Sequence, residues 1–225
     1  MIFNDFASRL AREYGLFLSA LTGRYLSMMS PGTEVSPMSI AQMQSAGDAM
    51  RRTYMELADR SVRDFVAQMS GEAMVEATKD FLKRIDSMTA QNIELLVDRM
   101  KGMKNNALDA VKENMHGSMG LLLQRQLMNP EYTVKTASGR TYEALGLMTT
   151  EARHFAYRTW LHAEMAKLSW TGDLAEVRYA DPEHKNNGLV FSMSGNTLGY
   201  PSFEDIADRV FHYNSTATIA PHVPT

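Results

Sequence analysis

The sequence has no cysteine among its 225 residues, so disulfide bonds, thiolate metal sites and a catalytic cysteine are excluded. Charges nearly balance, with a formal net charge of -3. A surface that grips nucleic acid over its whole extent needs concentrated Lys and Arg, and is therefore not expected. No apolar run approaches the roughly 18 residues that a membrane-spanning helix needs, and we expect no membrane span. The first residues, 1–5, lack the basic start of a signal peptide.

Sequence motifs of common catalytic sites are also missing. The chain has no GxSxG nucleophile elbow, no GxGxxG or GK[ST] phosphate loop and no HExxH pair. His184, His212 and His222 could converge with nearby aspartates on a metal, as in some hydrolases and nucleases, and this stays an alternative hypothesis. Because their spacings are long, we expect structural histidines instead, with no catalytic residue, cofactor or metal ligand.

Methionine is unusually frequent, with 18 residues, in an otherwise ordinary globular composition of 44% hydrophobic and 22% charged residues. Met side chains are flexible and suit adaptable helix–helix contacts. The first interpretation is a helical core. The second is a surface that repacks during assembly or during passage through a narrow channel.

Helical periodicity dominates residues 1–128, where apolar residues recur every three or four positions. The first predicted helix ends at Ser30–Gly32, because Pro31 cannot continue it. A second helix should begin near Ser36-Pro37 or Ser39 and break near Ser70-Gly71. A third segment, 72–127, should form two helices or one kinked helix. Its expected weak points are Gly102, Gly117 and Gly120.

The sequence pattern changes in residues 129–225, where helical periodicity gives way to short strands, turns and one further helix. A hairpin is expected over 132–140, and a helix over 145–168 with an N-cap near Thr149. A strand should follow at 174–179, and then loops with short strands. Ser202 and Asp205 have the spacing of a capping box. We therefore predict a mainly α fold with long N-terminal helices (1–128) and a small α+β C-terminal module (129–225).

Six short motifs follow one another in that module, and a seventh precedes them. They are GRTY at 139–142, GDLAEV at 172–177, DPEH at 181–184, NGLVFSMSG at 187–195, YPSFE at 200–204, FHYN at 211–214 and PH at 221–222. In this order they resemble the C-terminal part of tailed-phage minor capsid proteins, including relatives of the Mu-type head-morphogenesis domain. The resemblance covers residues 132–222.

The family pattern begins with a helix, a DLVEV-like strand and a His. It continues with a GKVFSxSG-like stretch, YPS[FL]E and an Asn-Cys element. Each matched position in this sequence has its counterpart in that pattern. The matching residues are Gly139, Arg140, His184, Gly188, Phe191, Gly195, Tyr200, Pro201, Phe203, His212 and Asn214. Ser215 departs from the pattern, since relatives often have Cys there. The departure favours a structural docking role over a metal site.

The resemblance implies a structural protein of the phage head, in a virion assembled in the host cytoplasm. It would act by protein–protein binding near the portal, in head assembly or DNA ejection, and not as an enzyme. Its expected partners are portal, capsid or neck proteins and further copies of itself. A helical neck or tail adaptor is a further alternative.

Five basic residues against two acidic ones in 99–125 allow two interpretations. The first is a solvated helix face, and the second is a weak contact with packaged DNA or an acidic partner. The basic residues are Arg99, Lys101, Lys104, Lys112 and Arg125.

Overall fold

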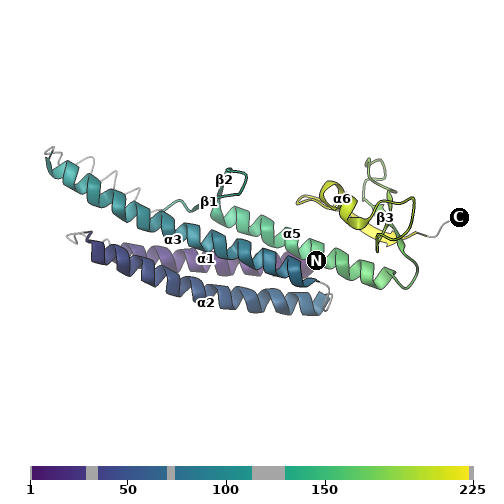
Figure 1. The fold of residues 1–225 in the computed structure, drawn as a ribbon, viewed down its shortest axis with the longest axis horizontal. Coiled ribbons are helices and arrows are strands. Elements are labelled where there is room, and N and C mark those ends of the chain that lie inside the picture. The colour runs from purple at the N-terminus through teal and green to yellow at the C-terminus, as the bar shows by residue number, and fades with distance from the viewer. Residues whose placement is uncertain (1, 29–34, 70–73, 113–129, 223–225) are drawn as a thin grey trace. The chain divides into compact units, whose positions relative to one another are not determined.

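The computed structural model describes residues 2–28, 35–69, 74–112 and 130–222 (Figure 1). The elements in chain order are α1 (Ile2–Met28), α2 (Pro37–Met69), α3 (Val75–Lys112), β1 (Thr133–Lys135), β2 (Thr141–Glu143), α5 (Ala144–Leu168), β3 (Leu174–Arg178), β4 (Val190–Ser192), α6 (Phe203–Val210) and β5 (Thr218–Pro221). The prediction of a mainly α fold with short strands near the C-terminus is confirmed. Within the described residues, no helix is long and apolar enough to cross a bilayer.

The chain forms two compact units, each assembled from separate segments. The bundle unit consists of residues 8–61 and 80–149, and the C-terminal unit of residues 1–7, 62–79 and 150–225. The boundary expected between residues 128 and 129 lies outside the described residues. Long helices therefore contribute to both units, α1 and α2 among them.

The bundle unit is held together by aromatic and polar contacts between α1, α2 and α3, which run side by side in Figure 1. The rings of Tyr14 and Tyr54 lie 5.7 Å apart across α1 and α2. From α3, the side-chain amide of the fully buried Asn92 donates to the Tyr14 hydroxyl and, at 2.9 Å, to the Met88 carbonyl oxygen. The stripe of apolar residues predicted along the first helix thus forms part of a real core.

Two close contacts join α2 to α3. A Cβ atom added at Gly47 would lie 2.6 Å from a methyl carbon of Ile93, so only glycine permits this approach. The Arg51 guanidinium donates two hydrogen bonds, of 2.7 and 2.6 Å, to the Asp86 carboxylate. This two-point geometry gives the pair directional specificity beyond its charge.

The first residues of α2 and α5 are capped by hydrogen bonds from different residue types. At the start of α2, the Ser39 N–H donates to the Ser36 hydroxyl at 3.1 Å, and the Ser36 N–H donates to the Ser39 hydroxyl at 2.8 Å, which confirms the predicted start. The N-cap predicted near Thr149 is wrong, because α5 begins five residues earlier, at Ala144. There the Glu143 carboxylate accepts hydrogen bonds from the first free N–H groups of the helix, which a Thr cap would otherwise have to satisfy.

Helix α3 continues through the expected weak point at Gly102, from Val75 to Lys112, so no helix ends there. A single glycine costs a helix only about 1 kcal/mol, which neighbouring turns outweigh. Gly117 and Gly120 lie outside the described residues. The predicted hairpin is confirmed, as β1 and β2 pair antiparallel with Val134 opposite Tyr142.

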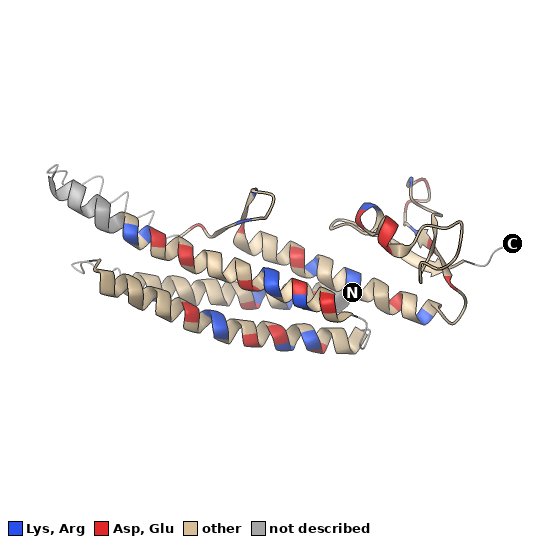
Figure 2. Cartoon of the chain, viewed as in Figure 1, with Lys and Arg blue, Asp and Glu red and all other residues tan. Residues whose placement is uncertain are grey.

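Charged residues of both signs are interspersed along the described helices (Figure 2). In the basic region of α3, the Lys101 ammonium lies 2.7 Å from the Asp98 carboxylate. The side chains of Lys104 and Lys112, and the whole of Arg125, lie outside what the structure describes. The DNA contact thus stays a prediction.

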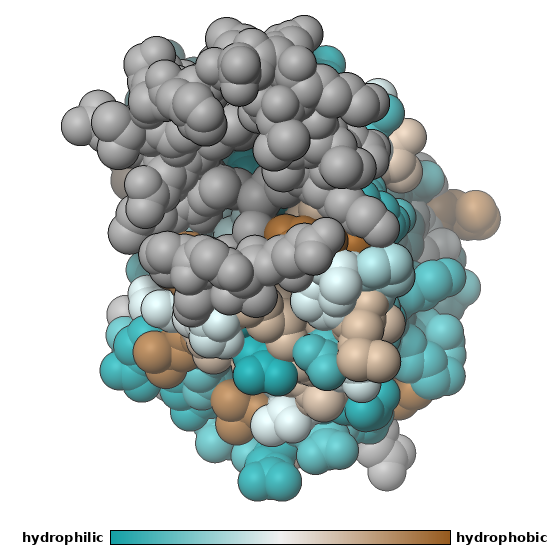
Figure 3. All heavy atoms as spheres, turned by 90° about the vertical axis from the view of Figure 1, so that its left-hand side faces the viewer, coloured by the Kyte–Doolittle hydropathy of each residue, from teal (hydrophilic) through white to brown (hydrophobic). Residues whose placement is uncertain are grey.

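Figure 3 shows the end of the bundle unit where α1 ends and α2 begins, with hydrophobic residues between hydrophilic ones on the described part of this face.

Candidate functional site

Three aromatic motif residues of the C-terminal unit meet in one small core. Strands β4, β3 and β5 form an antiparallel sheet in that order, and α6 and part of α5 pack against it. Three phenylalanines from three motifs fill the centre: the ring of Phe203 lies 6.0 Å from that of Phe191 and 5.4 Å from that of Phe211. All three are buried. Three of the motifs therefore each contribute one phenylalanine to the packing of this module.

Asp173 organises the loop that leaves this sheet. Its carboxylate accepts hydrogen bonds from the Ser192 hydroxyl, from the Thr197 hydroxyl at 2.5 Å and from the Ser194 N–H at 2.7 Å. Desolvation alone would raise the pKa of Asp173, but these hydrogen bonds outweigh it and lower the pKa to about 2. The carboxylate is thus held ionised, as a clamp between the start of β3 and the loop after β4.

The YPSFE motif begins α6 and fixes it to the sheet. Ser202 is the N-cap, and the predicted capping box with Asp205 is confirmed. The Ser192 N–H donates to the carbonyl oxygen of Pro201 at 2.9 Å. Gly195 has a φ of 75°, and a Cβ atom there would lie 3.3 Å from the Cβ atom of Ser202. Glycine at 195 therefore permits both the turn and the close approach.

Helix α5 holds the start of α6 through Arg158. Its guanidinium carbon lies 4.9 Å from the centre of the Phe203 ring, and it approaches the Glu204 carboxylate to 3.7 Å. The His162 ring meets the edge of Phe203 at 5.1 Å. Burial and the nearby Arg158 lower the pKa of His162. A neutral imidazole here acts as part of the packing.

The histidines in the matched motifs lie in separate places. His184 stacks on Tyr179 with ring centres 3.7 Å apart. The Nδ1 atom of His212 accepts a hydrogen bond from the Asn214 N–H at 3.2 Å. His222 lies 3.8 Å from the Glu176 carboxylate. Within the part of the chain that the structure describes, no three His, Asp or Glu side chains are grouped as metal ligands.

The remaining predicted residues divide between the two units. Gly188, with a φ of 80°, makes the turn before β4, while Tyr200 and Asn214 are exposed in the C-terminal unit. Gly139 and Arg140 belong to the bundle unit, in the turn between β1 and β2. The motif residues are therefore not all brought together.

Ser215, where the phage proteins that the motifs resemble often have Cys, lies between two tyrosines. Its hydroxyl oxygen is 3.4 Å from the hydroxyl oxygens of both Tyr157 and Tyr179. The Tyr179 hydroxyl donates to the carbonyl oxygen of Val210 at 3.0 Å. A small polar side chain at 215 therefore completes an internal contact.

Two large apolar side chains of this module face solvent, and sequence reasoning did not single them out. Trp170 is 92% exposed and Leu198 is 96% exposed. Trp170 lies in the turn before β3, and Leu198 lies in the loop after β4. Because Leu174 pairs with Ser192, both segments leave the same end of the sheet, where Asp173 joins them. This end, defined by Trp170 and Leu198, is the candidate docking site.

Comparison of the chain with protein-family models, with curated proteins and with solved structures gives no match. The family resemblance therefore rests on the motifs themselves.

Proposed function

We propose that this protein is a minor structural component of a tailed-phage virion that acts by protein–protein binding near the portal. It is a virion protein, assembled with the head in the host cytoplasm, and its role is mechanical attachment in head assembly or DNA ejection. The partners are portal, capsid or neck proteins and further copies of the chain.

The observation that carries the proposal is how the motif residues of the C-terminal unit are used. Phe191, Phe203 and Phe211 are buried together, and the Asp173 carboxylate is occupied by hydrogen bonds within the module. Because these side chains are buried or hydrogen-bonded within the module, they support a role as a binding scaffold. They are not free to act on a substrate. The ordered motifs supply the link to phage minor capsid proteins.

The exposed pair at one end of the sheet gives the scaffold a means of attachment. Large apolar side chains exposed beyond 90%, as Trp170 and Leu198 are, lose their hydration when a partner covers them. Trp is the residue type most enriched at energetically dominant interface positions. The Asp173 clamp supports the Leu198 loop, which reduces the entropy lost on binding.

The test is mass spectrometry of purified particles. The protein should be present in intact virions at a defined copy number, and its absence would end the proposal. Cross-linking within the particle should place it next to the portal or capsid, whereas contacts restricted to neck or tail proteins would favour the adaptor alternative.

A matched set of variants tests the docking site. Trp170→Ser and Leu198→Ser should each reduce incorporation into particles without loss of helix content, because both side chains are exposed. Lys185→Ser is the control, since Lys185 is exposed in the loop at the opposite end of the β3–β4 pair. Equal incorporation of all three variants would exclude this end of the sheet as the attachment point.

A further inference from the structure

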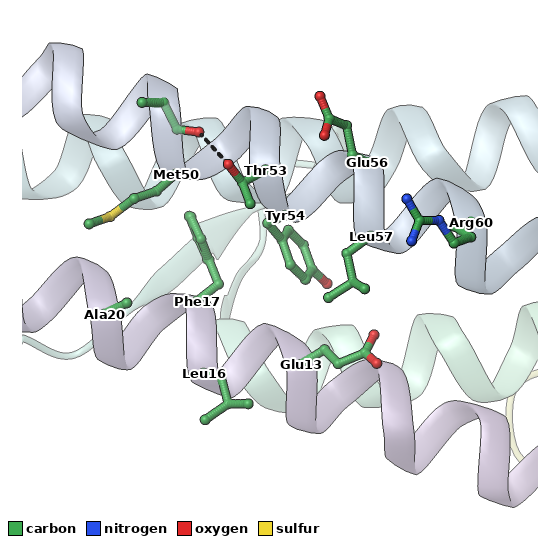
Figure 4. A pocket seen from close by; sticks show the side chains of 11 residues that line it. Glu13, Leu16, Phe17, Ala20, Met50, Thr53, Tyr54, Glu56, Leu57 and Arg60 are labelled. Atoms are coloured by element: carbon green, nitrogen blue, oxygen red, sulfur yellow. Dashed lines mark hydrogen bonds between the residues drawn. The ribbon is translucent and has the colours of Figure 1, made fainter.

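A groove runs between α1 and α2 of the bundle unit (Figure 4), with a volume of about 650 Å³. Its walls are mostly apolar and include Phe17 and Ala20 from α1 and Met50 from α2. At its rim Leu16 is 64% exposed and Leu57 is 41% exposed. The groove thus leaves apolar surface in water that neither helix covers.

Two buried polar atoms at this groove have no hydrogen-bond partner among the described residues. Tyr54 is only 5% exposed, and Figure 4 shows its side chain pointing from α2 into the groove, with the hydroxyl on the side of Leu57 and Glu13. Among the described residues, neither the Tyr54 hydroxyl nor the Oε2 atom of Glu13 has a hydrogen-bond partner, and both atoms are buried. Burial raises the pKa of Tyr54, so the hydroxyl stays protonated. An occupant that supplies a cationic donor at the rim would pair with the Glu13 carboxylate, which lies beside the Tyr54 hydroxyl.

The exposed ridge of α1 beside the groove has small residues that would let another helix pack closely against it. Leu16, Ala20 and Gly23 follow one another at helical spacing and are exposed. A Cβ atom at Gly23 would meet nothing within 4 Å, so the fold of the single chain does not require glycine there. Glycine inside a helix is nevertheless less favourable than alanine by about 1 kcal/mol. A neighbouring helix that packs closely on this ridge would account for it.

We propose that the occupant is a second copy of this chain, docked with its α1 antiparallel to the first α1. With the twofold axis at position 18, Leu16 of each copy lies over Ala20 of the other. Glu13 then lies opposite Gly23 of the other copy, beside Arg24, an exposed residue on the groove side of the helix. The Arg24 guanidinium, with its several donors, meets the Glu13 carboxylate at the edge of the groove.

Self-complementarity is what favours a second copy over another protein. One helix carries the protruding Leu16 and the small Ala20, and also the acidic Glu13 and the basic Arg24, in positions that exchange under a twofold rotation. This surface would serve the self-association that is part of the proposed function. It concerns the chain in solution, so absence from virions would end the proposed function and leave the dimer untouched.

The experiment is sedimentation equilibrium of the full chain over a range of concentrations. The wild-type chain should be a dimer. Glu13→Arg or Arg24→Glu alone should each raise the dissociation constant about tenfold or more, because each dimer then contains two like-charged contacts. Lys83→Glu, a substitution at an exposed position of α3 away from this ridge, is the control and should leave the dimer unchanged.

A charge exchange makes the test specific for two copies of this helix. Mixing the Glu13→Arg and Arg24→Glu chains should restore a dimer, since each chain then offers the charge that the other needs. Gly23→Leu should abolish the dimer while circular dichroism and thermal unfolding stay at wild-type values or better. A monomeric wild-type chain, no recovery on mixing, or cross-linking of this ridge to a different virion protein would each overturn the proposal.

Discussion

The hydroxyl of Tyr157 donates a hydrogen bond to the backbone carbonyl oxygen of Ala217, 2.7 Å away. Tyr157 lies in α5, and Ala217 immediately precedes β5, which forms one edge of the sheet. Both residues are buried, and burial raises the pKa of Tyr157 to about 12. This bond therefore attaches the last strand of the C-terminal unit to its main helix.

Removing that hydroxyl should loosen the C-terminal unit. Tyr157→Phe leaves the buried Ala217 carbonyl without its donor, which should lower the free energy of unfolding by about 1–3 kcal/mol. Urea denaturation followed by circular dichroism measures this. The control is Tyr213→Phe, which removes an exposed bond to Glu151 and should cost less than about 1 kcal/mol. Equal losses in the two variants would contradict the role given to Tyr157.

Asp173 should contribute stability that depends on acid pH. Its pKa of about 2 in the folded state lies below the ordinary value of 3.8, so the folded state favours the ionised form. The contribution is present above the ordinary pKa and is lost as the pH falls from about 4 toward about 2. The difference in unfolding free energy between the wild type and Asp173→Asn should shrink over this range. A difference that stays constant from neutral pH to pH 2 would show that the carboxylate is not stabilised as ionised.

Substituting alanine for two helical glycines should change the unfolding free energy in opposite directions. Gly102→Ala should raise the unfolding free energy by about 0.5–1 kcal/mol, because alanine favours helix and nothing lies within 4 Å of the new methyl group. Gly47→Ala should lower it by about 1–3 kcal/mol, because the methyl group would collide with Ile93. Thermal and urea unfolding of both variants measure the signs. A stabilising Gly47→Ala substitution would mean that α2 and α3 do not approach as closely as described.

The metal-dependent hydrolase alternative can be tested directly on the purified protein. His184→Ala should reduce stability, because it removes the stacking on Tyr179, and His212→Ala, at an exposed residue, should have little effect. Neither substitution should change the metal content measured by elemental analysis. Stoichiometric metal in the wild type that is lost in either variant would revive the alternative.

Local signals explain why parts of the fold could be predicted. The start of α2 at Ser36 and the capping box of Ser202 and Asp205 depend on hydrogen bonds between residues only three apart. The same reasoning failed at Thr149, because a carboxylate six residues earlier, on Glu143, satisfies the free N–H groups and lets the helix begin sooner. A sequence contains several competing caps, and packing of the helix decides among them.

Most of the candidate sites could not be predicted in this way. Nothing in the sequence distinguishes the exposed Trp170 and Leu198 from the buried apolar residues around them. The partners of Asp173 come from β4 and the loop that follows it, so its clamp exists only once β3 and β4 have paired.

The sequence by itself determined the helical periodicity, the hairpin, the cap of α6 and the exclusion of thiol chemistry, because these depend on composition or on residues close together in the chain. Only the tertiary structure decided that three phenylalanines from separate motifs share one core. It also decided that the Tyr54 hydroxyl and the Oε2 atom of Glu13 are buried beside an open groove with no hydrogen-bond partner among the described residues. Burial and hydrogen-bond satisfaction depend on which distant segments pack together. That choice is made by the whole chain when it folds, and not by any one stretch of it.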